Sequence, residues 1–192
     1  MKRIIIAALA VTMLTGCATR VNTEVSGFSE IGPAHQSASF QFAPLRDGQT
    51  LSAEYNSYAN IIAGHLSKHG WTQSPESSLG LAEYIVSFDY GISGSRSDLY
   101  SVQTRGKVGE SYYGNPIYGD TGNALHSRRV HTRFFTINII DAKTTRSVFE
   151  TIVISEGSSQ TFGAVARCLF NSALADFPAP RNGDETQVMA QC

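Results

Sequence analysis

The chain has 192 residues, with 15 Lys and Arg against 16 Asp and Glu and a formal net charge of −1. This balance excludes the strongly basic patch or domain that is typical of proteins that bind nucleic acid. It also excludes a protein held on anionic membranes by a polybasic segment.

The N-terminus has the parts of a secretory signal. A basic pair precedes an apolar run over residues 4–14, which is shorter than the roughly 20 residues needed to span a bilayer. The sequence Leu-Thr-Gly then precedes Cys17 and resembles the bacterial lipobox. That resemblance implies transfer of diacylglycerol to the Cys17 thiol and removal of residues 1–16, so that acyl chains anchor the protein in a membrane. Ala18 follows in place of aspartate, which by resemblance to the sorting pattern of Gram-negative lipoproteins favours the outer membrane, with the domain facing the periplasm.

The mature chain divides into a tether, one domain and a tail. Residues 17–36 are polar and punctuated by Gly and Ser, so we expect a lipidated tether. Residues 37–180 have the length of one ordinary domain. Residues 181–192 form a polar C-terminal tail.

The first half of the domain predicts a strand–helix–strand unit. Residues 38–42 alternate apolar and polar side chains, as a half-buried strand does. Apolar residues then recur at threes and fours over residues 51–69, with Gly70 after them, which predicts a helix. Residues 84–90 alternate again, and the handedness of such crossovers makes the two strands parallel.

Residues 91–127 lose this periodicity. The stretch is rich in Gly, Ser and Tyr and has few aliphatic residues, so we expect a long loop. A structureless loop of this length inside a compact domain is unusual, and it is either functional or disordered.

Two β-rich runs follow the loop, at residues 134–140 and 148–154, and predict a hairpin around a short polar turn. The apolar face of its first strand consists of Phe135, Ile137 and Ile139. The matching face of the second consists of Phe149, Thr151 and Val153, provided that Glu150 points to water. A bulge near the turn supplies the one-residue offset that this register needs.

An apolar stripe from Phe162 to Ala173 predicts a closing helix, capped by Ser158 or Ser159. Together the elements predict an α+β fold, a two-layer sandwich with a four-stranded mixed sheet. Their order is strand, helix, strand, long loop, hairpin and helix, and both helices cover one face of the sheet.

The order of several motifs resembles a known family. After the lipobox come LSKHGW at residues 66–71, AEYIVSF at 82–88, INIIDAKTTR at 137–146 and a closing FP at 177–178. The chain in this way resembles the bacterial lipoprotein family known as domain of unknown function 4136. It departs from the family pattern where Thr145 stands for the usual turn glycine and Phe149 for the usual tryptophan. The family has no established activity, so the resemblance implies no catalytic residue.

The long loop and its C-terminal end carry the candidate partner-contact residues. Tyrosine offers a large, rigid, amphipathic contact area, although tyrosines also occur in loops that only connect strands. The basic cluster at residues 126–133 suits a phosphate or carboxylate, because arginine makes bidentate contacts, and it equally suits a solvated strand entrance. The candidates are Tyr100, Tyr112, Tyr113, Tyr118, Arg128, Arg129 and Arg133.

Two cysteines remain besides Cys17, and both lie in a compartment that permits disulfides. The helical stripe predicts that Cys168 faces outward or sits at the boundary of the last helix. Cys192 ends a tail that is long enough to fold back. The two thiols therefore either form a disulfide or stay free.

Motifs for metal binding and catalysis are weak. His65 and His69 lie four apart, as in many zinc sites, but no third ligand is implied, so we expect no metal and no cofactor. No G-x-S-x-G occurs, and Gly157-Ser158-Ser159 indicates a helix cap, so we expect no enzyme.

We therefore expect a non-enzymatic, membrane-anchored lipoprotein that acts by contact with an envelope protein or polymer. One alternative is a carrier that holds a lipid or glycan in an apolar pocket between helices and sheet. A hydrolase is the third.

Overall fold

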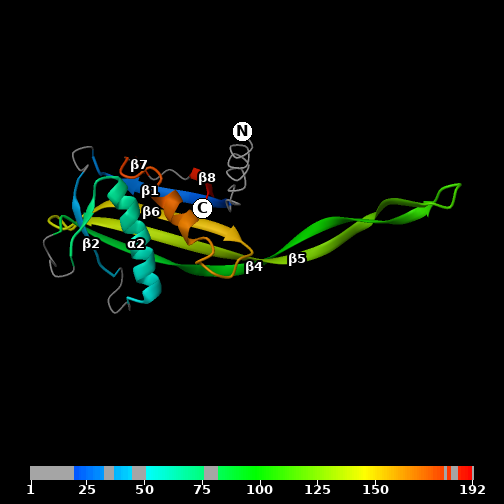
Figure 1. Ribbon diagram of the computed structural model, residues 1–192, viewed down its shortest axis with the longest axis horizontal. Coiled ribbons are helices and arrows are strands. Elements are labelled where there is room, and N and C mark those ends of the chain that lie inside the picture. The colour runs from blue at the N-terminus through cyan, green and yellow to red at the C-terminus, as the bar shows by residue number, and fades with distance from the viewer. Residues whose placement is uncertain are drawn as a thin grey trace, which may run out of the picture.

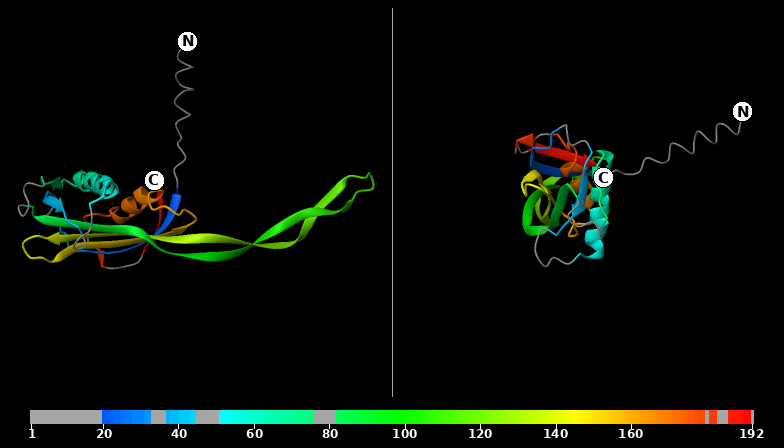
Figure 2. Two further views of the ribbon diagram at one scale, coloured as in Figure 1. Left: turned by 90° about the horizontal axis from the view of Figure 1, so that it is seen from below. Right: turned by 90° about the vertical axis from the view of Figure 1, so that its left-hand side faces the viewer.

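The computed structural model describes residues 20–32, 37–44, 51–75, 82–179, 181–182 and 186–191. In these residues one eight-stranded sheet has the strand order β3-β2-β4-β5-β6-β1-β7, and β8 also pairs with β1. Two helices lie on one side of it (Figures 1 and 2). The elements are β1 (Arg20–Ser29), β2 (Ser39–Phe42), α2 (Ala53–Lys68), β3 (Thr72–Gln73), β4 (Tyr84–Glu110), β5 (Pro116–Asp141), β6 (Ser147–Gly157), α3 (Ala166–Ala173), β7 (Arg181–Asn182) and β8 (Thr186–Gln191).

The predicted strand–helix–strand unit is confirmed as β2, α2 and β4. Strand β2 pairs with β4 in parallel, with Phe40 opposite Tyr84. Helix α2 begins after Ser52, whose hydroxyl accepts a hydrogen bond of 3.0 Å from the amide of Tyr55. Gly70 follows the helix with a φ of +82°, a left-handed conformation that glycine adopts without strain.

The register of the β5–β6 hairpin is also confirmed. Ile137 lies opposite Thr151 and Phe135 opposite Val153, all four of them buried, while Glu150 is exposed. The offset arises where the pairing shifts between Ile139 and Ile140, because Val148 bulges out of the ladder.

Aromatic rings fill the layer between the helices and the sheet. The Tyr55 ring of α2 stacks on Phe88 of β4 with centroids 4.3 Å apart. The Phe170 ring of α3 meets Phe135 of β5 at 4.6 Å and the Tyr58 ring of α2 at 5.3 Å. Rings that pack at these distances hold both helices on the sheet.

The predicted four-stranded sheet is wrong, although the class is still α+β. Residues 20–29, expected to belong to the tether, form β1, which pairs antiparallel with β6 and β8. Residues 186–191 of the expected tail form β8. Thr23 and Gly27 occupy inward positions on β1 and weaken its apolar alternation, which is why the sequence pattern conceals this strand.

Gly27 stands where β1 and β6 approach closely. A Cβ at this position would lie 2.6 Å from Oγ1 of Thr151. The glycine therefore allows β1 and β6 to pair closely. Because it has no apolar side chain, it also interrupts the alternation that would predict β1 from the sequence.

The closing helix is shorter than predicted, and it is buried on more than one side. Residues 158–162 are irregular, residues 163–165 form a turn, and α3 begins only at Ala166. Cys168 is fully buried, so its expected outward position is wrong. The reason is that α3 contacts β8 as well as β1, β5 and β6. A helical wheel that assumes one buried stripe cannot predict that β8 also packs against α3.

Candidate functional site

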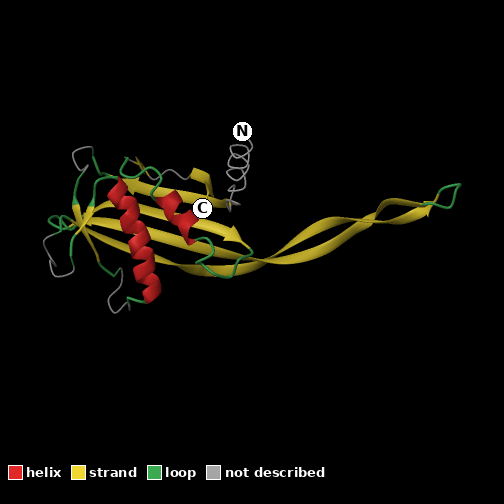
Figure 3. Cartoon of the chain, in the orientation of Figure 1, coloured by secondary structure: helices red, strands yellow, loops and turns green. Residues whose placement is uncertain are grey.

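Residues 91–127, expected to form a loop, continue β4 and β5 as a long antiparallel ribbon. Strand β6 pairs with β5 only as far as His131, so residues 94–130, here called the distal ribbon, have no third strand beside them. Figures 1 and 3 show this ribbon projecting from the body and ending in a short loop. At about 3.3 Å per residue, its 17-residue arm in β4 reaches roughly 50 Å.

The ribbon lacks the usual strand signal because, apart from the buried Val130 at its root, neither of its faces is covered by the body. Alternation of apolar and polar side chains arises when one face is buried. Polar cross-strand contacts take its place. Thr104 donates to the carbonyl of Gly122 at 2.9 Å, and Gln103 donates to Asp120 at 2.9 Å.

The loop at the tip is closed by Ser111 and Gly114. The amide of Gly114 donates to the carbonyl of Ser111 at 2.8 Å, and the amide of Ser111 donates to the carbonyl of Asn115 at 2.8 Å. Gly114 has a φ of +77°, which favours glycine. Pairing shifts between Ile92 and Gly94, and at two further points along the ribbon, add twist to it.

Exposed apolar side chains are concentrated on the distal ribbon. Among the described residues, nine of the fifteen large hydrophobic side chains that are exposed lie on it. They are Leu99, Tyr100, Val102, Val108, Tyr112, Tyr113, Ile117, Tyr118 and Leu125. Tyr112 and Tyr113 at the tip are 98% and 86% exposed, and Leu125 is 77% exposed. Such a concentration on one projecting element is typical of a binding surface.

The distal ribbon is also basic. It contains five Lys and Arg residues and three Asp and Glu residues, whereas the chain as a whole has a net charge of −1. Within the described residues Arg105 pairs with Asp120 at 3.7 Å and Lys107 pairs with Glu110, while Arg128 and Arg129 make no ion pair. These two arginines give the ribbon a positive charge that its own carboxylates do not balance.

Arg96 ties the root of the ribbon to β6. Its guanidinium donates to both carboxylate oxygens of Glu156, at 2.7 Å from Nη2 to Oε2, and to Asp98 at 2.9 Å. The hydrogen bonds from Arg96 hold the pKa of the Glu156 carboxyl below its ordinary value. A bidentate ion pair of this kind fixes direction as well as distance, so it orients the start of the distal ribbon relative to β6.

Six of the seven candidate contact residues lie along the distal ribbon, and the seventh does not. Tyr100 stacks on His126 with centroids 5.8 Å apart, and the guanidinium carbon of Arg128 lies 6.0 Å from the Tyr100 ring centroid. Arg133, by contrast, is only 2% exposed and belongs to the body. The basic cluster of the sequence is therefore two separate features.

Arg133 is a buried cation with few partners. It donates to the carbonyl of Ser155 at 3.5 Å and to the Ser155 hydroxyl at 3.3 Å. No carboxylate of the described residues lies within 4.0 Å of it. Burial lowers the pKa of the Arg133 guanidinium, and the charge of Glu156 offsets part of this effect.

The two helical histidines have partners within the fold. His65 forms a side-chain hydrogen bond with Asn171, and burial lowers the pKa of its imidazole. The His69 ring meets Phe177 edge-on at 5.4 Å. In the part of the chain that the structure describes, no group of three or more potential metal ligands occurs.

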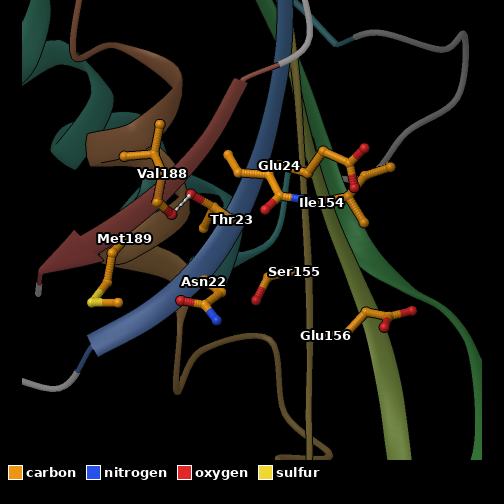
Figure 4. A pocket seen from close by; sticks show the side chains of 9 residues that line it. Asn22, Thr23, Glu24, Ile154, Ser155, Glu156, Val188 and Met189 are labelled. Carbon is orange, nitrogen blue, oxygen red and sulfur yellow. Dashed lines mark hydrogen bonds between the residues drawn. The ribbon is translucent and has the colours of Figure 1, made fainter.

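A groove of about 510 Å³ crosses β1 between β6 and β8 (Figure 4). Its wall mixes Ile154 and Met189 with Asn22 and Glu24, and Thr23 donates to the Val188 carbonyl at 3.0 Å. The groove lies outside the layer between helices and sheet, which aromatic rings fill. Among the described residues, aromatic rings occupy the layer in which the carrier hypothesis places its apolar pocket.

A family model described as domain of unknown function (DUF4136) matches residues 26–179. The chain belongs to this family. A second model, described as a prokaryotic membrane lipoprotein lipid attachment site, matches residues 1–18. This DUF4136 protein is thus a lipoprotein that a lipid anchors in a membrane of the cell envelope. Neither helix among its described residues has both the length and the apolar character needed to cross a membrane.

Solved structures include distant likenesses. A PDZ domain protein from Parabacteroides distasonis ATCC 8503 shares 12% identity at a TM-score of 0.48, over 94% of this chain and 41% of that protein. The chain therefore spans less than half of that protein's length. A PelC dodecamer from Paraburkholderia phytofirmans shares 17% identity at a TM-score of 0.44, over 83% of this chain and 99% of that one. No curated protein matches the chain.

Cys168 is disulfide-bonded, and its partner lies outside the described residues. The sequence contains two other cysteines, Cys17 and Cys192. Because the lipid occupies the thiol of Cys17, we expect the bond to join Cys168 and Cys192.

Counting thiols tests this pairing. We expect no free thiol in the unreduced, denatured mature protein and two after reduction. Cys192→Ser should lower the free energy of unfolding by roughly 2–4 kcal/mol, because it opens a loop of ordinary size in the unfolded chain. Two free thiols without reduction would show that the pairing is wrong.

Proposed function

We propose that this lipoprotein is a non-enzymatic adaptor of the outer membrane, facing the periplasm, whose distal ribbon binds another protein of the cell envelope. The observation that carries the proposal is the concentration of exposed apolar side chains on a projecting element. A two-stranded ribbon without a third strand or a covering helix is only marginally stable in water. A partner that covers the ribbon adds the burial that the body does not provide.

The chemistry of the ribbon favours a protein partner. Tyr112 and Tyr113 offer aromatic anchors at the tip, and such residues carry much of the binding energy at protein interfaces. The outer edge of β4 beyond Val86 and that of β5 before His131 pair with no strand among the described residues. Open edges of this kind accept an added strand from another protein.

The positive charge narrows the class of partner. Arg128 and Arg129 have no acidic partner within the described residues, so they suit a partner with carboxylates beside its apolar groove. The outer membrane is part of the proposal because Ala18, rather than aspartate, follows Cys17.

A pair of tip variants tests this function. Tyr112→Ser/Tyr113→Ser removes both rings, and Tyr112→Phe/Tyr113→Phe keeps them while removing the hydroxyls. After amine-reactive crosslinking in intact cells, we expect the serine variant to lose at least about tenfold of the crosslinked species, because aromatic anchors dominate interfaces. The phenylalanine variant should keep most of it.

Equal crosslinking by both tip variants and the unaltered protein would refute contact through the tip. A species that survives protease but not digestion of an envelope polymer would instead identify a polymer as the partner, against the proposal.

A further inference from the structure

The short chain between the lipid attachment site and β1 keeps the body near the membrane surface. Strand β1 begins at Arg20, which pairs with Gln191 of β8. Cys17 lies three residues before it, and three residues span at most about 11 Å even when fully extended. The expected tether of twenty residues is therefore reduced to Ala18 and Thr19. The end of the sheet at which β1 starts must lie close to the lipid headgroups.

This end of the sheet is also where β6 ends and the distal ribbon leaves the body. Thr23 of β1 lies opposite Ser155, and Gly157 of β6 lies opposite His131 of β5. Figure 2 shows the ribbon departing from the end of the sheet where β1 begins. Side chains gathered there can therefore reach lipid headgroups.

A pocket of about 330 Å³ opens at this same end. Its walls come from β1, β5, β6 and the segment after β6, and they include Asn22, Arg133, Ser158 and Ser159. Gly157 makes room for the guanidinium, because a Cβ there would lie 2.6 Å from Nη2 of Arg133. The sequence thus places a glycine where any side chain would displace the buried charge.

Arg133 and His131 have few hydrogen-bond partners in this region. Arg133 has five N–H donors, and its two hydrogen bonds both go to Ser155, at 3.3 Å and 3.5 Å. His131 lies two residues earlier on the same face of β5, and its buried Nε2 has no hydrogen-bond partner. Burial of the Arg133 cation is costly, and the charge of Glu156 offsets only part of that cost, so a bound anion is favoured here. Glu156 also lines the pocket, and both of its carboxylate oxygens accept hydrogen bonds from Arg96.

We infer that Arg133 and the Ser158 hydroxyl of this pocket bind the phosphate of an anionic lipid headgroup. Arginine matches the geometry of phosphate oxygens with parallel N–H donors. The Ser158 hydroxyl can add a further donor, whereas the Ser159 hydroxyl already donates to the carbonyl of Thr161 at 3.3 Å. The lipid anchor holds the pocket within reach of a surface dense in such phosphates. The inference is independent of the ribbon's partner, and it gives Arg133 a role distinct from that of Arg128 and Arg129.

Thermal unfolding of the lipidated full-length protein in nonionic detergent tests the site. Phosphatidylglycerol added to the micelles should raise Tm by about 5 °C at a hundredfold excess over the dissociation constant. The same mole fraction of diacylglycerol, which lacks the phosphate headgroup, should leave Tm unchanged. Inorganic phosphate is the third arm, because it tests for the free anion.

Two variants and a matched control make the result specific. Arg133→Gln should abolish the shift, whereas Arg129→Gln, the same change at an exposed position of the same strand, should retain it. Ser158→Leu fills the pocket from an exposed position without touching Arg133, and it should abolish the shift at an unchanged basal Tm. This second variant answers the question even if Arg133→Gln fails to fold.

Three outcomes would overturn the inference. They are no shift with phosphatidylglycerol, an equal shift in Ser158→Leu, or loss of the shift in Arg129→Gln. A shift with inorganic phosphate but none with phosphatidylglycerol would assign the pocket to a free anion and refute the lipid. A protein without the distal ribbon should still show the lipid shift, which separates this test from that of the proposed function.

Discussion

Replacing residues 99–127 with an Asn-Gly turn is expected to leave the folded body intact while abolishing contact with the partner. No residue in this segment belongs to the buried core, so its loss removes no core packing. The cut falls at the paired residues Asp98 and Arg128, where Asn-Gly closes a tight hairpin. Arg96 and its ion pair with Glu156 remain.

The truncated protein should unfold cooperatively, with a Tm within about 3 °C of the intact protein, because surface changes of this kind cost little. In cells it should lose the crosslinks that the intact protein forms. Loss of cooperative unfolding would show that the ribbon is part of the folding unit. Unchanged crosslinks would place the contact on the body.

Cys17→Ser should have an equally large effect at the other end of the molecule. Without the thiol no diacylglycerol is added, so the precursor should stay uncleaved and fail to partition into detergent. Each buried methylene contributes about 0.8 kcal/mol to membrane binding, and two acyl chains make the anchor stable. Mass spectrometry of the product and detergent phase separation measure the two effects.

Cys192→Ser is the matched control for Cys17→Ser, since it removes a thiol that lies outside the lipid attachment site. It should be processed and partition like the unaltered protein. A Cys17→Ser protein that is still cleaved and still held in the membrane would contradict lipidation at this residue.

Elements with one buried face are predictable from the sequence. The alternation of Tyr84, Val86 and Phe88 and the hairpin face of Phe135 and Ile137 follow from burial against helices, and the structure places all of them in the core. The family motifs and the lipobox can also be identified from the sequence, since short patterns in a fixed order are enough.

Elements without one continuous apolar face are not predictable from the sequence in this way. The distal ribbon is exposed on both faces and so carries no alternation, although Thr104, Gln103 and the tip glycine Gly114 are consistent with paired strands. Gly27 interrupts the apolar alternation of β1, and the close approach of β1 to Thr151 requires a glycine there. Long-range pairing of β1 with β6 and β8 leaves no local signal at all.

The candidate contact residues illustrate both results. The chemistry of tyrosine predicts contact positions for Tyr112 and Tyr118, and both lie exposed on a projecting element. Charge alone groups Arg133 with Arg128 and Arg129, but the register that pairs it with Ser155 turns it into the body. Only the pairing of the strands distinguishes it from Arg128 and Arg129.

A photo-crosslinking amino acid placed at single positions tests the central claim most directly. Tyr118 and Leu125 report from the distal ribbon, and Glu150 and Lys143 report from exposed positions on the body. We predict a discrete crosslinked protein of one mass from both ribbon positions in intact cells, and none from the two body positions. Crosslinks from Glu150 or Lys143 with none from the ribbon would contradict the account.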